Sequence, residues 1–589
     1  MEGSVSSPVR AEVGTMAIDA AMDSQSDSKL KYVIIFGAPL IAGVALYWYM
    51  RRRKGNALSK NSAGSSGVQK SDTRAVSQKK VDEQMKSQKE RATGYKDKGN
   101  RFFRNNRFKA AIESYSEGIK VCPVNETEML SIFYQNRAAS YEKLQMFDNV
   151  IQDCNKAIEL NKRYSKAYLR RAKAWEQRGE LRKCLEDATF SCMINDFKDE
   201  QALQLVDKML KLFGAQQAKE IYHQRKPSLP SSPYIRNFLR SFSEDPVILD
   251  LNAKRNNVPQ QKSHMPPSGY DLALQDLQDE IWDAVEAHCS EEIEKDQNKE
   301  KVDKALILRA GFSLITGKVT EAMKDVENLL SRENVDIKVR VNGLIKKATV
   351  ELHFEKTEEA LATFQKAVDL DPNNADIYLH RGQVYLLLDQ LDQTVKNFAT
   401  ASFLKPDFVS PNVQLAYTEY RAGTRFNDRA QQNAGRKKFN ECLKKFPNDS
   451  EVLFLYAQLM MGLEKYDSAE KYLNELIEIH PQDSAGFVHL GIIALQARKD
   501  IRGAVALMKT AIENDPKCQL AYETLGTLYI QTGQMVEGIA LLDKGIAMAQ
   551  TEAEIAHLIG LKTTAEIQMS ASKKFGTEVP LFSVPLAVN

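Results

Sequence analysis

The sequence predicts an all-α fold, an α-solenoid of about 10–11 repeated helical hairpins, preceded by a single membrane-spanning helix. Three observations predict this class. Prolines recur every 34 to 41 residues in the C-terminal half of the 589-residue chain. A small residue follows each of these prolines ten residues later. One run of 19 residues near the N-terminus contains no charged side chain.

The proline spacing sets the frame of the repeat. Pro372, Pro406, Pro447, Pro481 and Pro516 lie 34, 41, 34 and 35 residues apart. A period of 34 with a small residue at position 8 and proline at position 32 is the tetratricopeptide signature. Two antiparallel helices pack closely only where small residues lie at their crossing, and proline ends the second helix because it has no N–H to donate. The residues at position 8 are Gly99, Ala138, Ala172, Ala310, Ala348, Gly382, Ala416, Ala457, Gly491 and Gly526.

The repeats fall into two blocks with an interruption between them. Residues 92–225 hold three to four repeats, which we expect to form an N-terminal domain, and residues 269–589 hold the others as a C-terminal domain. Residues 226–268 contain seven of the 18 prolines and show no helical periodicity. We therefore predict an extended, proline-rich insertion between the two domains.

The uncharged run at residues 32–50 predicts the membrane anchor. At about 1.5 Å per residue it spans roughly 28 Å, close to the thickness of the hydrocarbon core. Four basic residues follow at 51–54, and positive charge on this side places the long C-terminal part in the cytosol. Residues 1–31 are then a short tail across the membrane, and residues 51–91 a basic flexible linker. A buried core helix is the alternative for the run.

Charge is unevenly distributed, although the whole chain has 81 basic and 78 acidic residues. Residues 1–50 carry 3 basic and 5 acidic side chains, a net charge of −2. Residues 51–91 carry 12 and 4, which gives +8, and residues 92–589 carry 66 and 69, which gives −3. A body this close to neutral argues against a nucleic-acid-binding protein.

No motif predicts catalysis, a cofactor or a resident metal ion. The seven cysteines are widely spaced, and the histidines form no H-E-x-x-H pair. The segment from Gly311 to Lys318 resembles a phosphate-binding loop, but its spacing is one residue too long and Val319 replaces the Ser/Thr. Because the repeats take up nearly the whole chain beyond the linker, we predict that the protein is not an enzyme.

Five polar residues on the first helices of repeats one to three are candidate ligand-binding residues. First-helix positions 2, 5, 6 and 9 line the concave groove of a tetratricopeptide stack. Cations and amides there suit a peptide's terminal carboxylate together with an acidic side chain, held by charge-assisted hydrogen bonds. No acidic residue stands at their own motif positions, and the alternative is an ordinary solvated surface. The five clamp residues are Lys96, Asn100, Asn136, Lys166 and Arg170.

The groove positions of the later repeats are largely apolar. Such a wall, with methionine and tyrosine in it, suits amphipathic or hydrophobic peptides and predicts a preprotein groove. Packing between neighbouring repeats is the alternative for any single residue. The candidates are Leu379, Tyr417, Tyr420, Phe454, Met461 and Ile492.

Two stretches around the clamp residues carry a resemblance to a known group. FYQNRAASYEKL (133–144) and KAYLRRAKAWEQRG (166–179) resemble the chaperone-binding tetratricopeptide domains. That resemblance implies that the partners are the acidic C-terminal tails of cytosolic heat-shock chaperones of the seventy- and ninety-kilodalton classes. With its anchor, basic neck and long C-terminal array, nearly the whole chain resembles the seventy-kilodalton import-receptor family of the mitochondrial outer-membrane translocase.

The family resemblance implies a location and further partners. It places the anchor in the mitochondrial outer membrane, residues 1–31 on the intermembrane-space side and the bulk of the chain in the cytosol. It also implies binding of preproteins with internal or hydrophobic signals, and of other translocase subunits that receive them. The alternative is a membrane-anchored co-chaperone or tether on another organelle, such as the endoplasmic reticulum.

Overall fold

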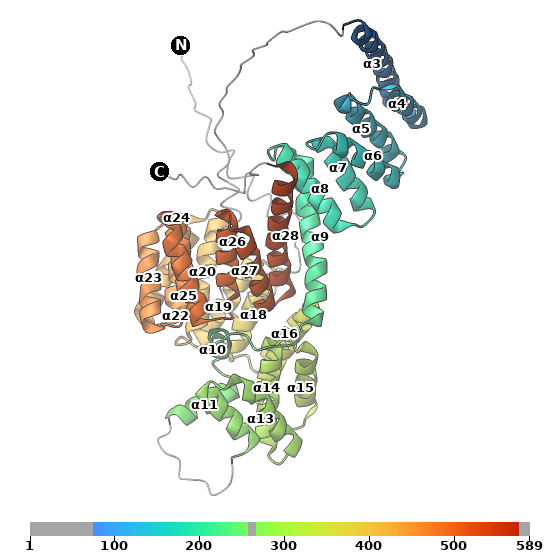
Figure 1. Cartoon of the computed structure of the whole chain (residues 1–589). Coiled ribbons are helices and arrows are strands. Elements are labelled where there is room, and N and C mark those ends of the chain that lie inside the picture. The colour runs from blue at the N-terminus through green and yellow to red at the C-terminus, as the bar shows by residue number, and fades with distance from the viewer. Residues whose placement is uncertain (1–74, 257–266, 577–589) are drawn as a thin grey trace, which may run out of the picture. The chain divides into compact units, whose positions relative to one another are not determined.

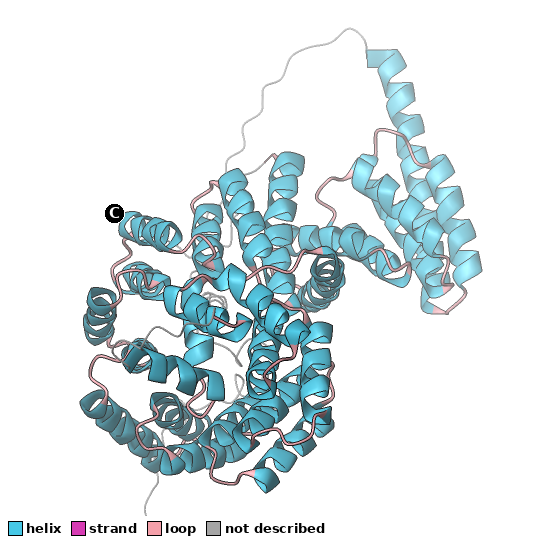
Figure 2. Ribbon diagram, turned by 90° about the horizontal axis from the view of Figure 1, so that it is seen from below, coloured by secondary structure: helices cyan, strands magenta, loops and turns pink. Residues whose placement is uncertain are grey.

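A computed structural model describes residues 75–256 and 267–576 of the chain, and these residues form 26 helices, α3 to α28, without a strand (Figure 2). The all-helical repeat fold predicted from the sequence is confirmed. The predicted anchor at residues 32–50 and the tail at 1–31 lie outside the described residues. Within the described ranges, no helix combines the length and the apolar character needed to cross a membrane.

The N-terminal repeats form three hairpins and one long helix. In each hairpin the two helices pack together, and the second helix also contacts the first helix of the next hairpin, which stacks the repeats. The helices are α3 (Ala75–Arg104), α4 (Phe108–Val121), α5 (Thr127–Lys143), α6 (Phe147–Leu160), α7 (Ser165–Gln177), α8 (Leu181–Ile194) and α9 (Glu200–Gln224).

Helix α3 begins inside the segment predicted to be a flexible linker. The linker was expected to extend over residues 51–91, but the helix already starts at Ala75. Residues 75–91 contain Ala, Gln, Lys, Glu and Met and neither glycine nor proline, so their helix propensity is high. The prediction is therefore wrong for this part of the segment: low hydrophobicity excludes a core but does not exclude a helix.

The proline-rich insertion is also helical rather than extended. It contains α10 (Ser232–Arg240) and α11 (Pro246–Asn256). Pro233 lies in the first turn of α10 and Pro246 is the first residue of α11. Proline at the start of a helix costs no hydrogen bond, because the first N–H groups have no partner within the helix. The prolines that suggested an interruption of helical structure thus start two helices.

The later repeats continue the hairpin pattern. The helices are α12 (Gly269–Asp279), α13 (Trp282–Lys295), α14 (Lys299–Ile315), α15 (Val319–Ser331), α16 (Ile337–His353), α17 (Thr357–Leu370), α18 (Ala375–Leu387), α19 (Leu391–Leu404), α20 (Val409–Arg425), α21 (Arg429–Lys445), α22 (Ser450–Gly462), α23 (Tyr466–Ile479), α24 (Ser484–Ala497), α25 (Ile501–Asn514), α26 (Gln519–Gln531), α27 (Met535–Met548) and α28 (Glu552–Phe575).

The helices divide into two compact units that differ from the predicted domains. One unit contains residues 226–256 and 267–486, and the other contains residues 75–225 and 487–576 among the described residues. The C-terminal end of the chain thus belongs with the N-terminal repeats, and the insertion belongs with the middle repeats. The prediction of a single C-terminal domain over residues 269–589 is wrong in this respect.

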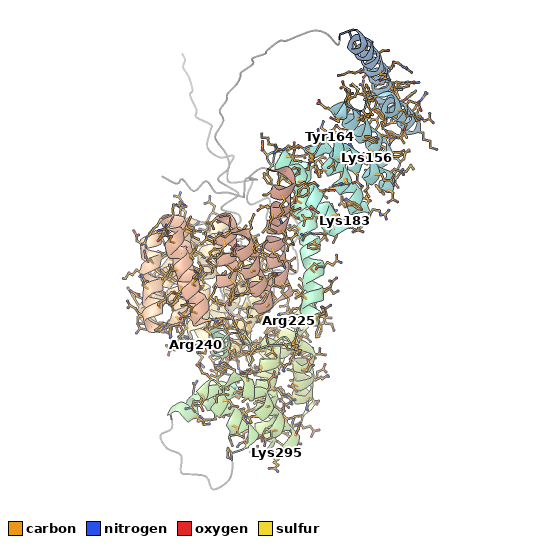
Figure 3. The ribbon with its side chains drawn as sticks, in the orientation of Figure 1. Lys156, Tyr164, Lys183, Arg225, Arg240 and Lys295 are labelled. Carbon is orange, nitrogen blue, oxygen red and sulfur yellow. The ribbon has the colours of Figure 1, made fainter. Side chains whose placement is uncertain are left out.

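The last helix of the N-terminal repeats, α9, packs against α28, the last helix that the structure describes (Figure 1). The helices cross closely at Gly214, where an added Cβ would lie 2.8 Å from the carbonyl oxygen of Ala556. Farther along, the ring of Phe575 packs edge-on against the rings of Tyr168 and Phe190, at centroid distances of 6.1 and 5.4 Å. Arg225, at the end of α9 in Figure 3, donates to the carbonyl oxygen of Gln550 at 2.8 Å.

An arginine–aspartate pair recurs within the hairpins at a spacing of 16 residues. The arginine lies on the first helix and the aspartate on the second, and both side chains are mostly buried. In the α18–α19 hairpin an asparagine takes the place of the aspartate. The pairs are Arg137–Asp153 at 2.7 Å, Arg171–Asp187 at 2.6 Å and Arg309–Asp325 at 2.6 Å, and the variant is Arg381–Asn397 at 2.8 Å.

Gly435 tests the requirement for small residues between paired helices. A Cβ at this position on α21 would lie 2.5 Å from the backbone nitrogen of Tyr420 on α20, which cannot move aside as a side chain does. We expect Gly435→Ala to lower the free energy of unfolding by about 1–3 kcal/mol, measured by urea denaturation. Gly462→Ala is the matched control, because nothing lies within 4 Å of the added Cβ there. Equal effects of the two substitutions would contradict the packing argument.

Candidate functional site

The first helices of the N-terminal repeats lie side by side and carry all five clamp residues. Helix α5 contacts both α3 and α7. Lys96 and Asn100 lie one turn apart on α3, Asn136 lies on α5, and Lys166 and Arg170 lie one turn apart on α7. Residues four apart on a helix share one face, so the three helices present these side chains to one groove.

Asn100 and Asn136 are directly bonded to each other. The amide Nδ2 of Asn136 donates to Oδ1 of Asn100 at 3.3 Å, and the hydroxyl of Tyr115 donates to the same oxygen at 2.8 Å. Burial raises the pKa of Tyr115 to about 12, so the hydroxyl keeps its proton at neutral pH. Because Oδ1 of Asn100 is taken by two donors, its own Nδ2 is left to donate to a ligand.

Arg170 has an acidic partner within the chain. Its Nε donates to Oε2 of Glu142 at 2.8 Å, and its Nη1 donates to the carbonyl oxygen of Gln135 at 3.4 Å. The arginine side chain is 21% exposed and that of Glu142 is 31% exposed. No acidic residue stands at the motif positions of the clamp, and Glu142 was not predicted because it lies six residues beyond Asn136 on α5, outside those positions. The two contacts use Nε and Nη1, on different sides of the guanidinium, and leave Nη2 for a ligand.

The two clamp lysines are available to an anion. Lys96 is half-buried and Lys166 is exposed, and within the described part of the chain neither forms an ion pair. With Arg170 they make three cations, against the single carboxylate of Glu142. The groove therefore has an excess of two positive charges, which equals the charge of a terminal carboxylate plus one acidic side chain.

A cavity of about 570 Å³ adjoins this face, and its walls include two lysines outside the predicted clamp, Lys173 and Lys208. The walls come from α5, α7 and α9. Lys173 donates to Oε1 of Gln201 at 3.2 Å. The spacing from Lys166 to Arg170 to Lys173 is four and then three residues, which keeps all three on one face of α7. This spacing is the signal in the sequence from which Lys173 could have been predicted.

The apolar groove candidates separate into core and half-buried residues. Leu379 is completely buried and packs with Phe398 and Phe408, and Phe454 and Ile492 are 9% and 3% exposed. These three residues therefore pack within the fold, which is the alternative interpretation. Side chains with so little exposed surface cannot contact a bound peptide. The half-buried candidates are Tyr417, Tyr420 and Met461.

The stacked hairpins, with small residues at the helix crossings, define a tetratricopeptide-repeat protein. Residues 355–389 match the family described as TPR repeat, and residues 432–487 and 495–561 match the family described as Tetratricopeptide repeat. The chain is 35% identical over 567 residues to the mitochondrial import receptor subunit TOM70 of Rattus norvegicus, covering 93% of this chain and 92% of that protein. The chain therefore belongs to the family of the mitochondrial import receptor subunit TOM70.

Two further similarities concern a co-chaperone and a solved structure. The chain is 32% identical over 169 residues to the Hsp70/Hsp90 co-chaperone CNS1 of Saccharomyces cerevisiae, covering 27% of this chain and 43% of that protein. The crystal structure of yeast Tom70 aligns with a TM-score of 0.48 and 24% sequence identity, over 82% of this chain and 99% of that chain.

Proposed function

We propose that the groove of α3, α5 and α7 binds the acidic C-terminal tail of a partner protein. The observation that carries this proposal is the convergence of Lys96, Lys166 and Arg170 on a face where the Asn100–Asn136 pair is already fixed by hydrogen bonds. The two lysines, Arg170 and the amides hold the terminal carboxylate and an acidic side chain. Such charge-assisted bonds are roughly twice as strong as neutral ones.

The partners that fit this chemistry are the seventy- and ninety-kilodalton heat-shock chaperones. A peptide that ends in an acidic residue offers two carboxylates close together, which matches the two excess charges of the groove. The similarity to a protein named as an Hsp70/Hsp90 co-chaperone supports the same assignment. The sequence around the clamp residues supports it independently of that name.

The chain acts as an import receptor of the mitochondrial outer membrane. Residues 32–50 anchor it, residues 1–31 lie on the intermembrane-space side, and the repeats face the cytosol. The receptor takes preproteins with internal or hydrophobic signals from the chaperones and passes them to other subunits of the translocase. Membership of the import-receptor family supports this function, and the repeats serve as a binding scaffold without catalysis.

Binding of a free carboxyl terminus is the direct test. The probe is a fluorescently labelled peptide that ends in Glu-Glu-Val-Asp, compared with the same peptide carrying an amidated C-terminus. We expect the amide to lower the affinity by about 10- to 100-fold, since it removes one of the two carboxylates. Fluorescence anisotropy of both peptides against the protein measures this ratio. Equal affinities would mean that the groove does not recognise a chain end.

A tether on another organelle is the second candidate, favoured by the anchor and the clamp alone. The two candidates differ in where the chain is found in the cell and in what binds to it. Crosslinking of the cytosolic part, scored for both chaperones and precursors of membrane carriers, distinguishes them. Recovery of chaperones without precursors would favour the tether.

A further inference from the structure

The insertion between the two repeat blocks runs across the middle repeats. Residues 231–251, here the inner segment, comprise α10, the turn after it and the start of α11. Ion pairs connect this segment to four hairpins of the same compact unit, three of them successive, and Arg240, labelled in Figure 3, makes the one at α22. The pairs are Lys304–Asp250 on α14, Lys338–Glu244 on α16, Lys405–Glu244 after α19 and Arg240–Asp449 at the start of α22.

Five of the residues that face the inner segment stand at the groove positions of the repeat. Counting from position 8 of each repeat, they occupy positions 2 and 6 of the first helices. In the N-terminal repeats, the clamp residues Lys166 and Arg170 occupy the same two positions. The inner segment therefore lies where a ligand of a tetratricopeptide groove would lie. The residues at position 2 are Lys304, Asn342 and Asp376, and those at position 6 are Lys346 and His380.

Asp376 binds the backbone of the inner segment. One carboxylate oxygen accepts from the backbone N–H of Ser243 at 2.9 Å and from its hydroxyl at 2.6 Å, and the other accepts from the N–H of Glu244 at 2.8 Å. The side chain of Asp376 is almost fully buried, so these bonds replace its contacts with water. A carboxylate at position 2 selects N–H donors, whereas the lysine at this position in the clamp selects an anion.

Two phenylalanines anchor the inner segment. Phe238 and Phe242 lie one helical turn apart and are 3% and 5% exposed. The ring of Phe242 packs on His380 with a centroid distance of 4.4 Å, and the Lys346 ammonium lies 4.6 Å from the same ring. Gly311 lies directly beside this site, because an added Cβ would lie 3.2 Å from Cε of Lys346 and 3.4 Å from the ring of Phe238. Aromatic anchors of this kind dominate the energy of peptide binding to a groove.

We infer that the inner face of α14, α16, α18 and the start of α22 is a peptide-binding groove that holds the inner segment as its resident ligand. Its ligand has two aromatic residues one turn apart, followed by free backbone N–H groups and an acidic residue. A segment on the same chain has an effective concentration of about millimolar, so a separate peptide competes with it poorly. A peptide of this chemistry binds when the resident segment is weakened or displaced, independently of the acidic-tail clamp.

The test uses the chain's own segment as the probe. A labelled synthetic peptide of residues 231–252 is titrated into the full-length protein in detergent and followed by anisotropy. We expect Phe242→Ala protein to bind it at least about tenfold more tightly than the unaltered protein, since loss of the ring weakens the resident segment. Adding Asp376→Ala to Phe242→Ala removes the receptor carboxylate and is expected to abolish that gain.

A peptide that carries the same Phe242→Ala change is the matched control and is expected to bind neither protein. The inference is wrong if the unaltered protein binds the natural peptide as tightly as the variant does, or if the variant is folded by circular dichroism and does not bind it. Should Phe242→Ala not fold, Arg240→Ala takes its place, because Arg240 is exposed and loses its ion pair with Asp449 and a hydrogen bond to the Ser450 hydroxyl without opening the core. We then expect a smaller gain in affinity, and an unchanged affinity would overturn the inference.

Discussion

Replacement of Arg170 by alanine is expected to weaken binding of a peptide ending in Glu-Glu-Val-Asp by about 10- to 100-fold. The substitution removes the charge-assisted hydrogen bonds of one guanidinium, which contribute about 1.5–3 kcal/mol. It leaves Glu142 without its partner, but that carboxylate is 31% exposed and water replaces the arginine at little cost. The fold is therefore expected to stay intact, with a change of less than about 1 kcal/mol in the free energy of unfolding.

The control for this prediction is Arg178→Ala. Arg178 lies at the C-terminal end of α7, the helix that carries Arg170, and is ion-paired with Asp148 in the first turn of α6. Helix α6 is the second helix of its hairpin and does not line the groove. Both variants lose one positive charge, so titration calorimetry at equal ionic strength separates a specific contact from a general loss of attraction. Equal losses would attribute the effect to net charge. Unchanged affinity of the Arg170→Ala variant would exclude the arginine from the site.

The positions of the five candidate clamp residues on neighbouring helices were predictable from the sequence, because they depend on local geometry. Helical spacing puts Lys166 and Arg170 on one face, and the 34-residue period brings α3, α5 and α7 together. Contacts between side chains do not follow from the period. The pair of Arg170 with Glu142 depends on how α5 and α7 are spaced, and the burial of Leu379 depends on its neighbours in the next hairpin.

Long-range pairing of elements was not predictable from the repeat pattern. Every hairpin has an apolar face on each side, so the repeat pattern does not specify which helices pack together over a long distance in the sequence. The contact of α9 with α28 therefore could not be predicted from it. The insertion was misjudged for a different reason. Its many prolines indicate an extended segment, whereas in the structure Pro233 and Pro246 lie where helices begin.

Asp187→Ala is expected to destabilise the N-terminal repeats by about 3–5 kcal/mol. Two parallel hydrogen bonds of 2.6 Å join the aspartate to Arg171, and the two side chains are 5% and 16% exposed. Removing one partner leaves the other charge buried and uncompensated, which costs far more than loss of an exposed pair. Urea denaturation followed by the fluorescence of Trp175, in a background with Trp48→Phe and Trp282→Phe, reports on this unit.

The size of the loss depends on burial, and a double substitution separates burial from pairing. Burial raises the pKa of Asp187 although its bonds to Arg171 lower it, so for the aspartate desolvation outweighs the attraction to its partner. Arg171→Met combined with Asp187→Leu is therefore expected to recover most of the stability that Asp187→Ala loses. Lys156→Ala, which breaks an exposed pair with Glu159 on α6 (Figure 3), is expected to change stability by less than about 0.5 kcal/mol. If Asp187→Ala has an equally small effect, the recurrent pairs are solvated and do not hold the hairpins together.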